Sequence, residues 1–211
     1  DSFVVKYSTI IMSISQISET LFILAIPFFL KRFGIKQVML ISMLAWVLRF
    51  GLFSFGNPTD GLWMIVLSCI VYGMAFDFFN ISGSLFVETH TDNSNRSSAQ
   101  GLFMMMTNGV GAILGSFTSG WAIDRFFTKS FTTTTDLASF LQTDVTNSKM
   151  MEFVKSQGNS VTDGVLNHAI MMKDWHNIWL AFAIYSLIIA VAFAVLFKHE
   201  HNPNEAESLK H

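Results

Sequence analysis

Hydrophobic residues occur along this chain of 211 residues in five long runs separated by polar segments. A helix needs about 20 predominantly apolar residues to cross the hydrocarbon core of a bilayer. The five runs meet this requirement, and the pattern therefore predicts an all-α fold, a polytopic membrane helix bundle with five transmembrane helices. The predicted spans cover residues 7–30, 37–55, 61–87, 99–123 and 175–197.

The segments between the runs predict the orientation. Residues 31–36 hold Lys31, Arg32 and Lys36, and basic residues concentrate in cytoplasmic loops. Alternation then places residues 124–174 outside and the tail, residues 198–211, in the cytoplasm. Basic residues within 124–174 oppose this assignment, but acidic residues lie there too, and long segments follow the rule less strictly. We expect a periplasmic segment that is either a small cap or a mobile loop.

Composition supports a membrane protein. The chain is 51% hydrophobic and 13% charged, whereas soluble domains carry about 25% charged residues. A net charge of −2 without a basic stripe gives no indication of nucleic-acid binding. The chain begins at Asp1 and enters a hydrophobic run within a few residues, so we interpret it as a fragment of a longer protein.

Two carboxylates, Glu19 and Asp77, lie near the middle of predicted spans. A charge at the bilayer centre costs about 2.5–3.5 kcal/mol on insertion scales. Residues that carry this cost usually mark a substrate or proton pathway. Glu19 shares a helical face with Gln16, three residues earlier. An interhelical hydrogen-bonded patch would explain Gln16 alone, but burying the charge of Glu19 is too costly for that purpose.

The second carboxylate lies in an aromatic segment. Tyr72, Phe76, Asp77 and Asn80 follow one another at i, i+4, i+5 and i+8. Aromatic faces and nearby carboxylate and amide groups suit a flat, polar, uncharged molecule. The alternative for the phenylalanines is ordinary packing, because the chain contains 22 Phe residues.

Proton coupling is the expected second role of these carboxylates. A buried carboxylate can exchange a proton near neutral pH, which makes both Glu19 and Asp77 proton-coupling candidates. A sodium site is the alternative, because carboxylate, amide and hydroxyl oxygens suit hard cations. Spacing does not distinguish between the two carboxylates.

Two further polar residues are of second rank. Arg49 either extends toward the outer interface or pairs with a buried acid. Asn108 either lines the cavity or joins helices by a hydrogen bond. No histidine spacing matches a structural metal site, and no catalytic motif is present, so we expect neither an enzyme nor a bound metal or cofactor.

Several segments resemble a known family. Residues 32–36, between two spans, are similar to the loop motif of the major facilitator superfamily. Residues 13–22, 75–84 and 103–109 resemble the nucleoside–proton symporter family of that superfamily more specifically. The likeness extends from about residue 10 to 126 and resumes at residue 174.

The resemblance implies a twelve-helix transporter of which this chain forms helices 8 to 12. It implies import of purine and pyrimidine nucleosides by proton symport across the bacterial inner membrane, with the C-terminus in the cytoplasm. The proton gradient, the lipid bilayer and an N-terminal half of the same transporter would be the other participants. The implied binding residues are Gln16, Glu19, Tyr72, Phe76, Asp77 and Asn80.

Two alternatives remain open. One is a sugar or drug carrier of the same superfamily. The other is a membrane sensor that does not transport and uses residues 124–174 to bind its ligand.

Overall fold

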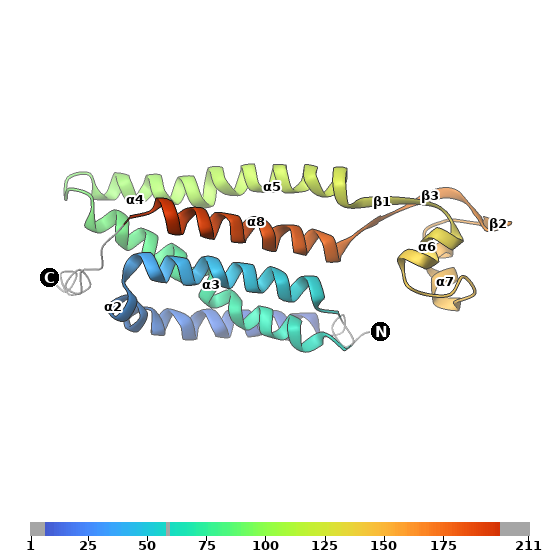
Figure 1. The fold of residues 1–211 in the computed structure, drawn as a ribbon, viewed down its shortest axis with the longest axis horizontal. Helices are drawn as coiled ribbons and strands as arrows, with labels where there is room; N and C mark the ends of the chain where they lie inside the picture. Colours follow the sequence, from blue (N-terminus) through green and yellow to red (C-terminus); the bar gives the residue numbers. More distant parts are fainter. Residues whose placement is uncertain (1–6, 58–59, 199–211) are drawn as a thin grey trace. The chain divides into compact units, whose positions relative to one another are not determined.

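The computed structural model describes residues 7–57 and 60–198, which divide into two compact units. Among the described residues, the first unit comprises residues 7–57, 60–116 and 176–198, and the second comprises residues 117–175. The helices are α2 (Ser8–Phe55), α3 (Leu62–Thr89), α4 (Arg96–Met104), α5 (Gly111–Ala122) and α8 (Trp175–Leu196) (Figure 1). The predicted tail lies, apart from Lys198, outside the described residues.

Four helices in the described part of the chain are long and apolar enough to cross a membrane. They are Ser8–Phe55, Leu62–Thr89, Arg96–Phe127 and Trp175–Leu196. The third combines α4 and α5 with two π-helical stretches, Met105–Val110 and Ile123–Phe127. The sequence predicted five spans, and the structure accounts for them with four helices. The first helix, Ser8–Phe55, contains a break and covers two of the predicted spans.

The break in α2 lies at Gly34, whose φ of 77° and ψ of 169° are not helical. A positive φ is easily reached only by glycine, which lacks a Cβ. Gly34 therefore divides α2 into a first arm, residues 8–33, and a second arm, residues 35–55. The sequence predicted a connecting loop over residues 31–36, and this was wrong in detail: the helices continue up to a one-residue joint.

The core of the first unit forms where both arms of α2 meet α3. Phe78 of α3 is fully buried, with its ring centroid 5.0 Å from that of Phe29 and 5.9 Å from that of Phe22. Burying an aromatic side chain removes a large apolar area from solvent. The other buried members of this cluster are Ile26, Leu30, Ile35, Val38, Met39 and Leu85.

A buried hydrogen bond joins the second arm of α2 to α3. The Ser42 hydroxyl donates to the carbonyl oxygen of Ala75 at 2.6 Å, and Ser42 is fully buried. Ser42→Ala is expected to lower the stability of the purified protein by about 0.5–1.5 kcal/mol, the net value of such a bond. Thermal unfolding in detergent measures this effect.

Ser13→Ala is the matched control. The Ser13 hydroxyl also donates to a main-chain carbonyl, that of Thr9 at 2.8 Å, but it is exposed and within one helix. Its replacement should leave the unfolding temperature unchanged. Equal decreases in the unfolding temperature of Ser42→Ala and Ser13→Ala would show that the interhelical hydrogen bond stabilises the protein no more than the one within a helix.

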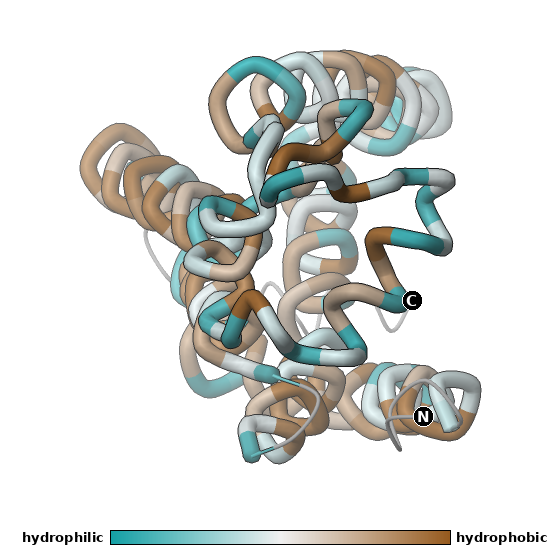
Figure 2. The backbone as a smooth tube through the Cα atoms, turned by 90° about the vertical axis from the view of Figure 1, so that its right-hand side faces the viewer, coloured by the Kyte–Doolittle hydropathy of each residue, from teal (hydrophilic) through white to brown (hydrophobic). Residues whose placement is uncertain are grey.

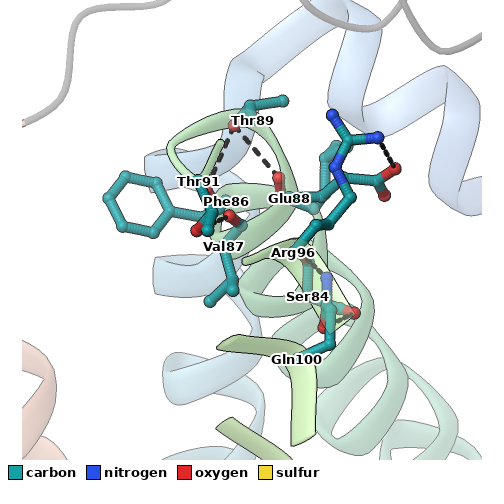
Figure 3. Close-up of polar contacts among 9 residues, drawn as sticks. Ser84, Phe86, Val87, Glu88, Thr89, Thr91, Arg96 and Gln100 are labelled. Atoms are coloured by element: carbon teal, nitrogen blue, oxygen red, sulfur yellow. Dashed lines mark hydrogen bonds and ion pairs between the residues drawn. The ribbon is translucent and has the colours of Figure 1, made fainter. Parts of the chain in front are cut away.

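Polar contacts also join α3 to α4 (Figure 3). Gln100 Nε2 donates to the Ser84 carbonyl at 2.7 Å, while the Ser84 hydroxyl donates to Gln100 Oε1 at 2.8 Å. Arg96 forms an ion pair with Glu88 at 3.2 Å. These paired contacts orient the start of α4 against the end of α3.

The N-terminal part of α8 is held against the second arm of α2. The Ser54 hydroxyl donates to the His176 carbonyl at 2.9 Å, and His176 Nδ1 lies 2.8 Å from the Ser54 carbonyl. One turn later Trp179 stacks on Phe50, with a centroid distance of 5.9 Å. These contacts bring α8 into the first unit.

Apolar side chains also cover the outer surface of these helices. Leu24, Ile113 and Leu196 are 75%, 71% and 78% exposed, and hydrophobic residues recur along the helical coils in Figure 2. Exposed apolar surface of this extent marks a membrane or protein interaction surface.

The second unit contains a small antiparallel sheet in the order β1-β3-β2, which the all-α expectation did not include. Its strands are β1 (Thr128–Thr133), β2 (Val161–Thr162) and β3 (Val165–Lys173). Two short helices, α6 (Thr134–Phe140) and α7 (Ser148–Ser156), complete the unit. A separate apolar cluster stabilises it, built on Phe131, Leu137, Val154, Leu166 and Ile170.

A signal for this sheet is present in the sequence. Asp163 and Gly164 join β2 to β3 with φ values of 52° and 79°. A two-residue Asp-Gly loop with both φ values positive is a favoured hairpin turn. The polar composition of residues 124–174 predicted either a small cap or a mobile loop, and the structure has a small folded unit there. The Asp-Gly dipeptide was the signal for its hairpin.

Candidate functional site

The first arm of α2 and α3 cross with very close backbones at Gly73. A Cβ built on Gly73 would lie 2.6 Å from the Glu19 nitrogen and 2.7 Å from the Ser18 carbonyl carbon. The Ser18 hydroxyl donates to the Ile70 carbonyl at the same crossing. Glycine therefore allows the helix that carries Glu19 to lie directly against the helix that carries Asp77.

The two carboxylates belong to one electrostatic cluster. Asp77 interacts with the charge of Glu19, and Tyr72 interacts with Glu19, Asp77 and Arg49. The sequence placed Glu19 and Asp77 at the middle of separate spans, and the fold brings them together. Two acidic groups at one helix crossing can bind polar groups of a ligand and exchange a proton.

Asp77 is the more buried of the two acids, with 8% of its surface exposed. Its Oδ2 atom is buried and has no hydrogen-bond partner among the described residues. An unsatisfied buried polar atom costs about 1–3 kcal/mol, and more when charged. Asp77 is therefore suited to accept a hydrogen bond from a ligand or to hold a proton.

An aromatic surface adjoins the carboxylates. The Tyr72 and Phe76 rings are stacked, with centroids 5.8 Å apart and planes inclined by 26°. The Trp46 ring lies edge-on to Tyr72 at 6.0 Å. Phe76 is 38% exposed, so part of this aromatic surface is open to a flat ligand.

Arg49 joins the cluster from the second arm of α2. Its guanidinium carbon lies 4.2 Å from the centroid of the Tyr72 ring. In the described part of the chain Arg49 forms no ion pair, so the expected pairing with a buried acid is not observed. The Arg49 Nη1 atom is buried, without a hydrogen-bond partner among the described residues, although the residue as a whole is only partly buried. The other alternative, an extension toward the outer interface, stays a prediction.

The remaining predicted residues lie at the edge of the cluster or outside it. Gln16 is exposed, one helical turn before Glu19. Asn80 is half-buried and its Nδ2 donates to the Phe76 carbonyl at 3.0 Å within α3. Asn108 lies in the π-helical stretch Met105–Val110, and its Nδ2 is 3.4 Å from Met104 Sδ. These contacts leave the Asn80 and Asn108 amide oxygens available.

A separate cavity of about 250 Å³ lies between α2, α3 and α8. It is lined mostly by apolar side chains, namely Met43, Trp46, Phe79, Ser186 and Ile189. The carboxylates do not line it, so this cavity is distinct from the acidic cluster. Among the described residues no group of three His, Cys, Asp or Glu side chains could hold a metal ion.

Sequence reasoning missed the importance of Gly73 and Trp46. Glycine is common in membrane helices, so a single Gly beside Tyr72 gave no specific signal. Trp46 lies three residues before Arg49, which places both on one helical face. This spacing was the available indication of a shared aromatic environment.

The helices and their site have the character of a multi-pass membrane protein with a polar site on its membrane-length helices. Comparisons with known proteins agree. The family model described as "Nucleoside H+ symporter" matches residues 1–202. The chain therefore belongs to this family, and the predicted resemblance is confirmed.

Two relatives from Escherichia coli (strain K12) illustrate the similarity. Xanthosine permease is 50% identical over 212 residues, which cover 100% of this chain and 40% of that protein. Nucleoside permease NupG is 48% identical over 201 residues, which cover 95% of this chain and 38% of that protein. The chain thus spans about two fifths of the length of the relatives it matches.

Solved structures support the fold. A crystal structure of nucleoside transporter NupG aligns with a TM-score of 0.67 at 47% identity, covering 94% of this chain and 39% of that one. A second structure of NupG, of a mutant, aligns with a TM-score of 0.69 at 46% identity, covering 94% and 39%. The predicted membrane helix bundle is confirmed, and the relatives are named as transporters or permeases, not as enzymes.

Proposed function

We propose that this chain forms the C-terminal portion of a secondary transporter that imports nucleosides together with protons. Family membership supports the transporter class. The observation that supports a nucleoside as the substrate is a cluster of acidic and aromatic side chains. In it the buried Asp77 and nearby Glu19 adjoin the stacked rings of Tyr72 and Phe76.

This chemistry fits a nucleoside. A nucleoside has a flat base that stacks on aromatic rings, and ribose hydroxyls and base edges that donate to carboxylate and amide oxygens. In the proposal Tyr72 and Phe76 stack on the base. Gln16, Glu19, Asp77 and Asn80 bind its polar groups, with Asn108 as a further candidate.

Alternating access is the proposed mechanism. Transporters of this general kind bind substrate near the bilayer midplane, between two halves that rock around the site. The exposed face of Gln16 and Phe76 would meet the N-terminal half. Glu19 and Asp77 are the proposed proton carriers, in the inner membrane of a bacterium and with the C-terminus in the cytoplasm.

Uptake measurements test the substrate class. The full-length transporter, expressed in bacteria that lack nucleoside uptake, should accumulate labelled uridine or adenosine. Unlabelled nucleosides should compete with the label because they present the same base and ribose groups, whereas hexoses should not. A protonophore should abolish accumulation and a sodium-free medium should not.

Two results would contradict this proposal. Competition by sugars but not by nucleosides would identify a carrier for a different substrate. If accumulation requires sodium and persists in the presence of the protonophore, the coupling ion is sodium and not the proton. The substrate assignment would be unaffected by this result.

A further inference from the structure

Arg49 is a partly buried cation whose role the proposed contacts do not explain. It lies within a membrane-length helix, and its Nη1 atom is buried without a hydrogen-bond partner among the described residues. A charge in this position is costly. A residue of this kind requires a compensating interaction that the hydrogen bonds and ion pairs of the described residues do not supply.

Aromatic rings supply that interaction. The guanidinium carbon lies 4.2 Å from the ring centroid of Tyr72, 5.2 Å from that of Phe53 and 5.6 Å from that of Trp46. A cation within about 6 Å of an aromatic centroid is attracted by the negative face of the ring. Tyr72 is the closest of the three and is also a proposed stacking residue for the base.

The Tyr72 ring is therefore held from several sides. Arg49 lies over it, Trp46 contacts it edge-on at an interplanar angle of 81°, and Phe76 stacks with it at 26°. The hydroxyl end of Tyr72 interacts with Glu19 and Asp77 as well as with Arg49. Replacing Arg49 would therefore remove one of the groups that contact the Tyr72 ring.

We propose that Arg49 is a positioning residue for nucleoside recognition, which fixes the orientation of the Tyr72 ring by a cation–π contact. The inference rests on the proposed function, because it assigns Tyr72 to the base. Arg49 does not itself touch the substrate. A planar guanidinium stacks on an aromatic face, whereas the compact, strongly hydrated ammonium of lysine fits such a site poorly.

Nucleoside binding by the purified full-length transporter tests the inference. Arg49→Met keeps an unbranched apolar side chain but removes the cation, and it should raise the Kd for uridine or adenosine about fivefold to tenfold. Arg49→Lys should give a smaller increase. In uptake assays the loss should be in KM, with kcat unchanged, because the ring orients the bound base and does not take part in proton transfer.

The effect must act through Tyr72. In a Tyr72→Leu background, Arg49→Met should cause no further increase in Kd, since the ring that Arg49 orients is gone. Phe53→Leu removes another ring near Arg49 that is not a proposed substrate contact, and should leave Kd unchanged. Arg32→Met is the matched control: Arg32 lies 5.7 Å from the Phe33 centroid, remote in sequence from the proposed site, and is exposed.

Several outcomes would overturn the inference. An unchanged Kd in Arg49→Met, or an equal increase in the presence and absence of the Tyr72 ring, would show that Arg49 has only a structural role. If Arg49→Met does not fold, a wild-type Kd in Arg49→Lys with a wild-type KM would contradict the inference. Failure of the wild-type transporter to bind any nucleoside would instead contradict the proposed function, so the two failures can be distinguished.

Discussion

Asp77→Asn is expected to reduce nucleoside uptake by the full-length transporter about tenfold to a hundredfold. Asparagine has almost the same shape as aspartate, but its amide is neutral. It neither accepts hydrogen bonds as strongly nor exchanges a proton. A hydrogen bond to a charged group contributes about 1.5–3 kcal/mol, and each 1.4 kcal/mol corresponds to a tenfold change in affinity. Initial uptake rates of labelled nucleoside measure the loss.

The same variant separates binding from coupling. If Asp77 binds the ribose or base, both net uptake and nucleoside exchange across the membrane will fall. If it carries the proton, exchange will persist while accumulation against a gradient is lost. Glu19→Gln should show at least one of these losses, since Glu19 interacts with Asp77.

Asp92→Asn is the control for the change of charge. Asp92 lies between α3 and α4 and is exposed, so its neutralisation should leave uptake unchanged. Pairing Asp77→Asn with Glu19→Gln is the decisive experiment for the site. Undiminished, pH-dependent uptake in both variants would refute the assignment of these carboxylates.

Gly73→Ala is expected to disrupt both the bundle and uptake. The added methyl would meet the Glu19 nitrogen at 2.6 Å and the Ser18 carbonyl oxygen at 2.8 Å. These are backbone atoms of a helix and cannot rotate away as a side chain does. The helices must separate, and overpacking of this kind costs about 1–3 kcal/mol or more. Thermal unfolding in detergent and nucleoside uptake should both show the loss.

Gly51→Ala is the matched control on α2. A Cβ at Gly51 meets nothing within 4 Å, so alanine should be tolerated there. Because glycine within a helix is about 1 kcal/mol less favourable than alanine, this variant should be slightly more stable than the wild type. Wild-type uptake and stability in Gly73→Ala would show that the close crossing is not required.

The apolar runs and the positions of charges within them were sufficient to predict the bundle and its acidic residues. Hydrophobic length follows from bilayer thickness, and the cost of a buried charge is local to each residue. Glu19 and Asp77 could therefore be selected without a structure. The break at Gly34 was less predictable. A glycine between two helical segments is equally compatible with a short loop and with a one-residue break in one helix.

The partner of Arg49 could not be predicted from spacing. Both alternatives considered for it, the outer interface and a buried acid, assumed that a cation seeks water or an anion. The fold places aromatic rings from two helices 4.2 to 5.6 Å from its guanidinium carbon, a contact that neither alternative included. Spacing within one span identifies which residues share a face, but not which face of another helix they meet.

The sequence by itself determined the membrane class and the presence of two carboxylates, Glu19 and Asp77, at positions where a charge is energetically costly. It also determined that aromatic residues lie near Asp77 on the same helix. Only the tertiary structure decided that these two acids lie at one crossing, that Gly73 permits it, and that Arg49 lies over Tyr72. The physical reason is that hydrophobicity and charge cost depend on each residue and its neighbours along the chain. Helix contacts depend instead on the shapes of surfaces far apart in sequence, and there a single missing Cβ sets the distance between backbones.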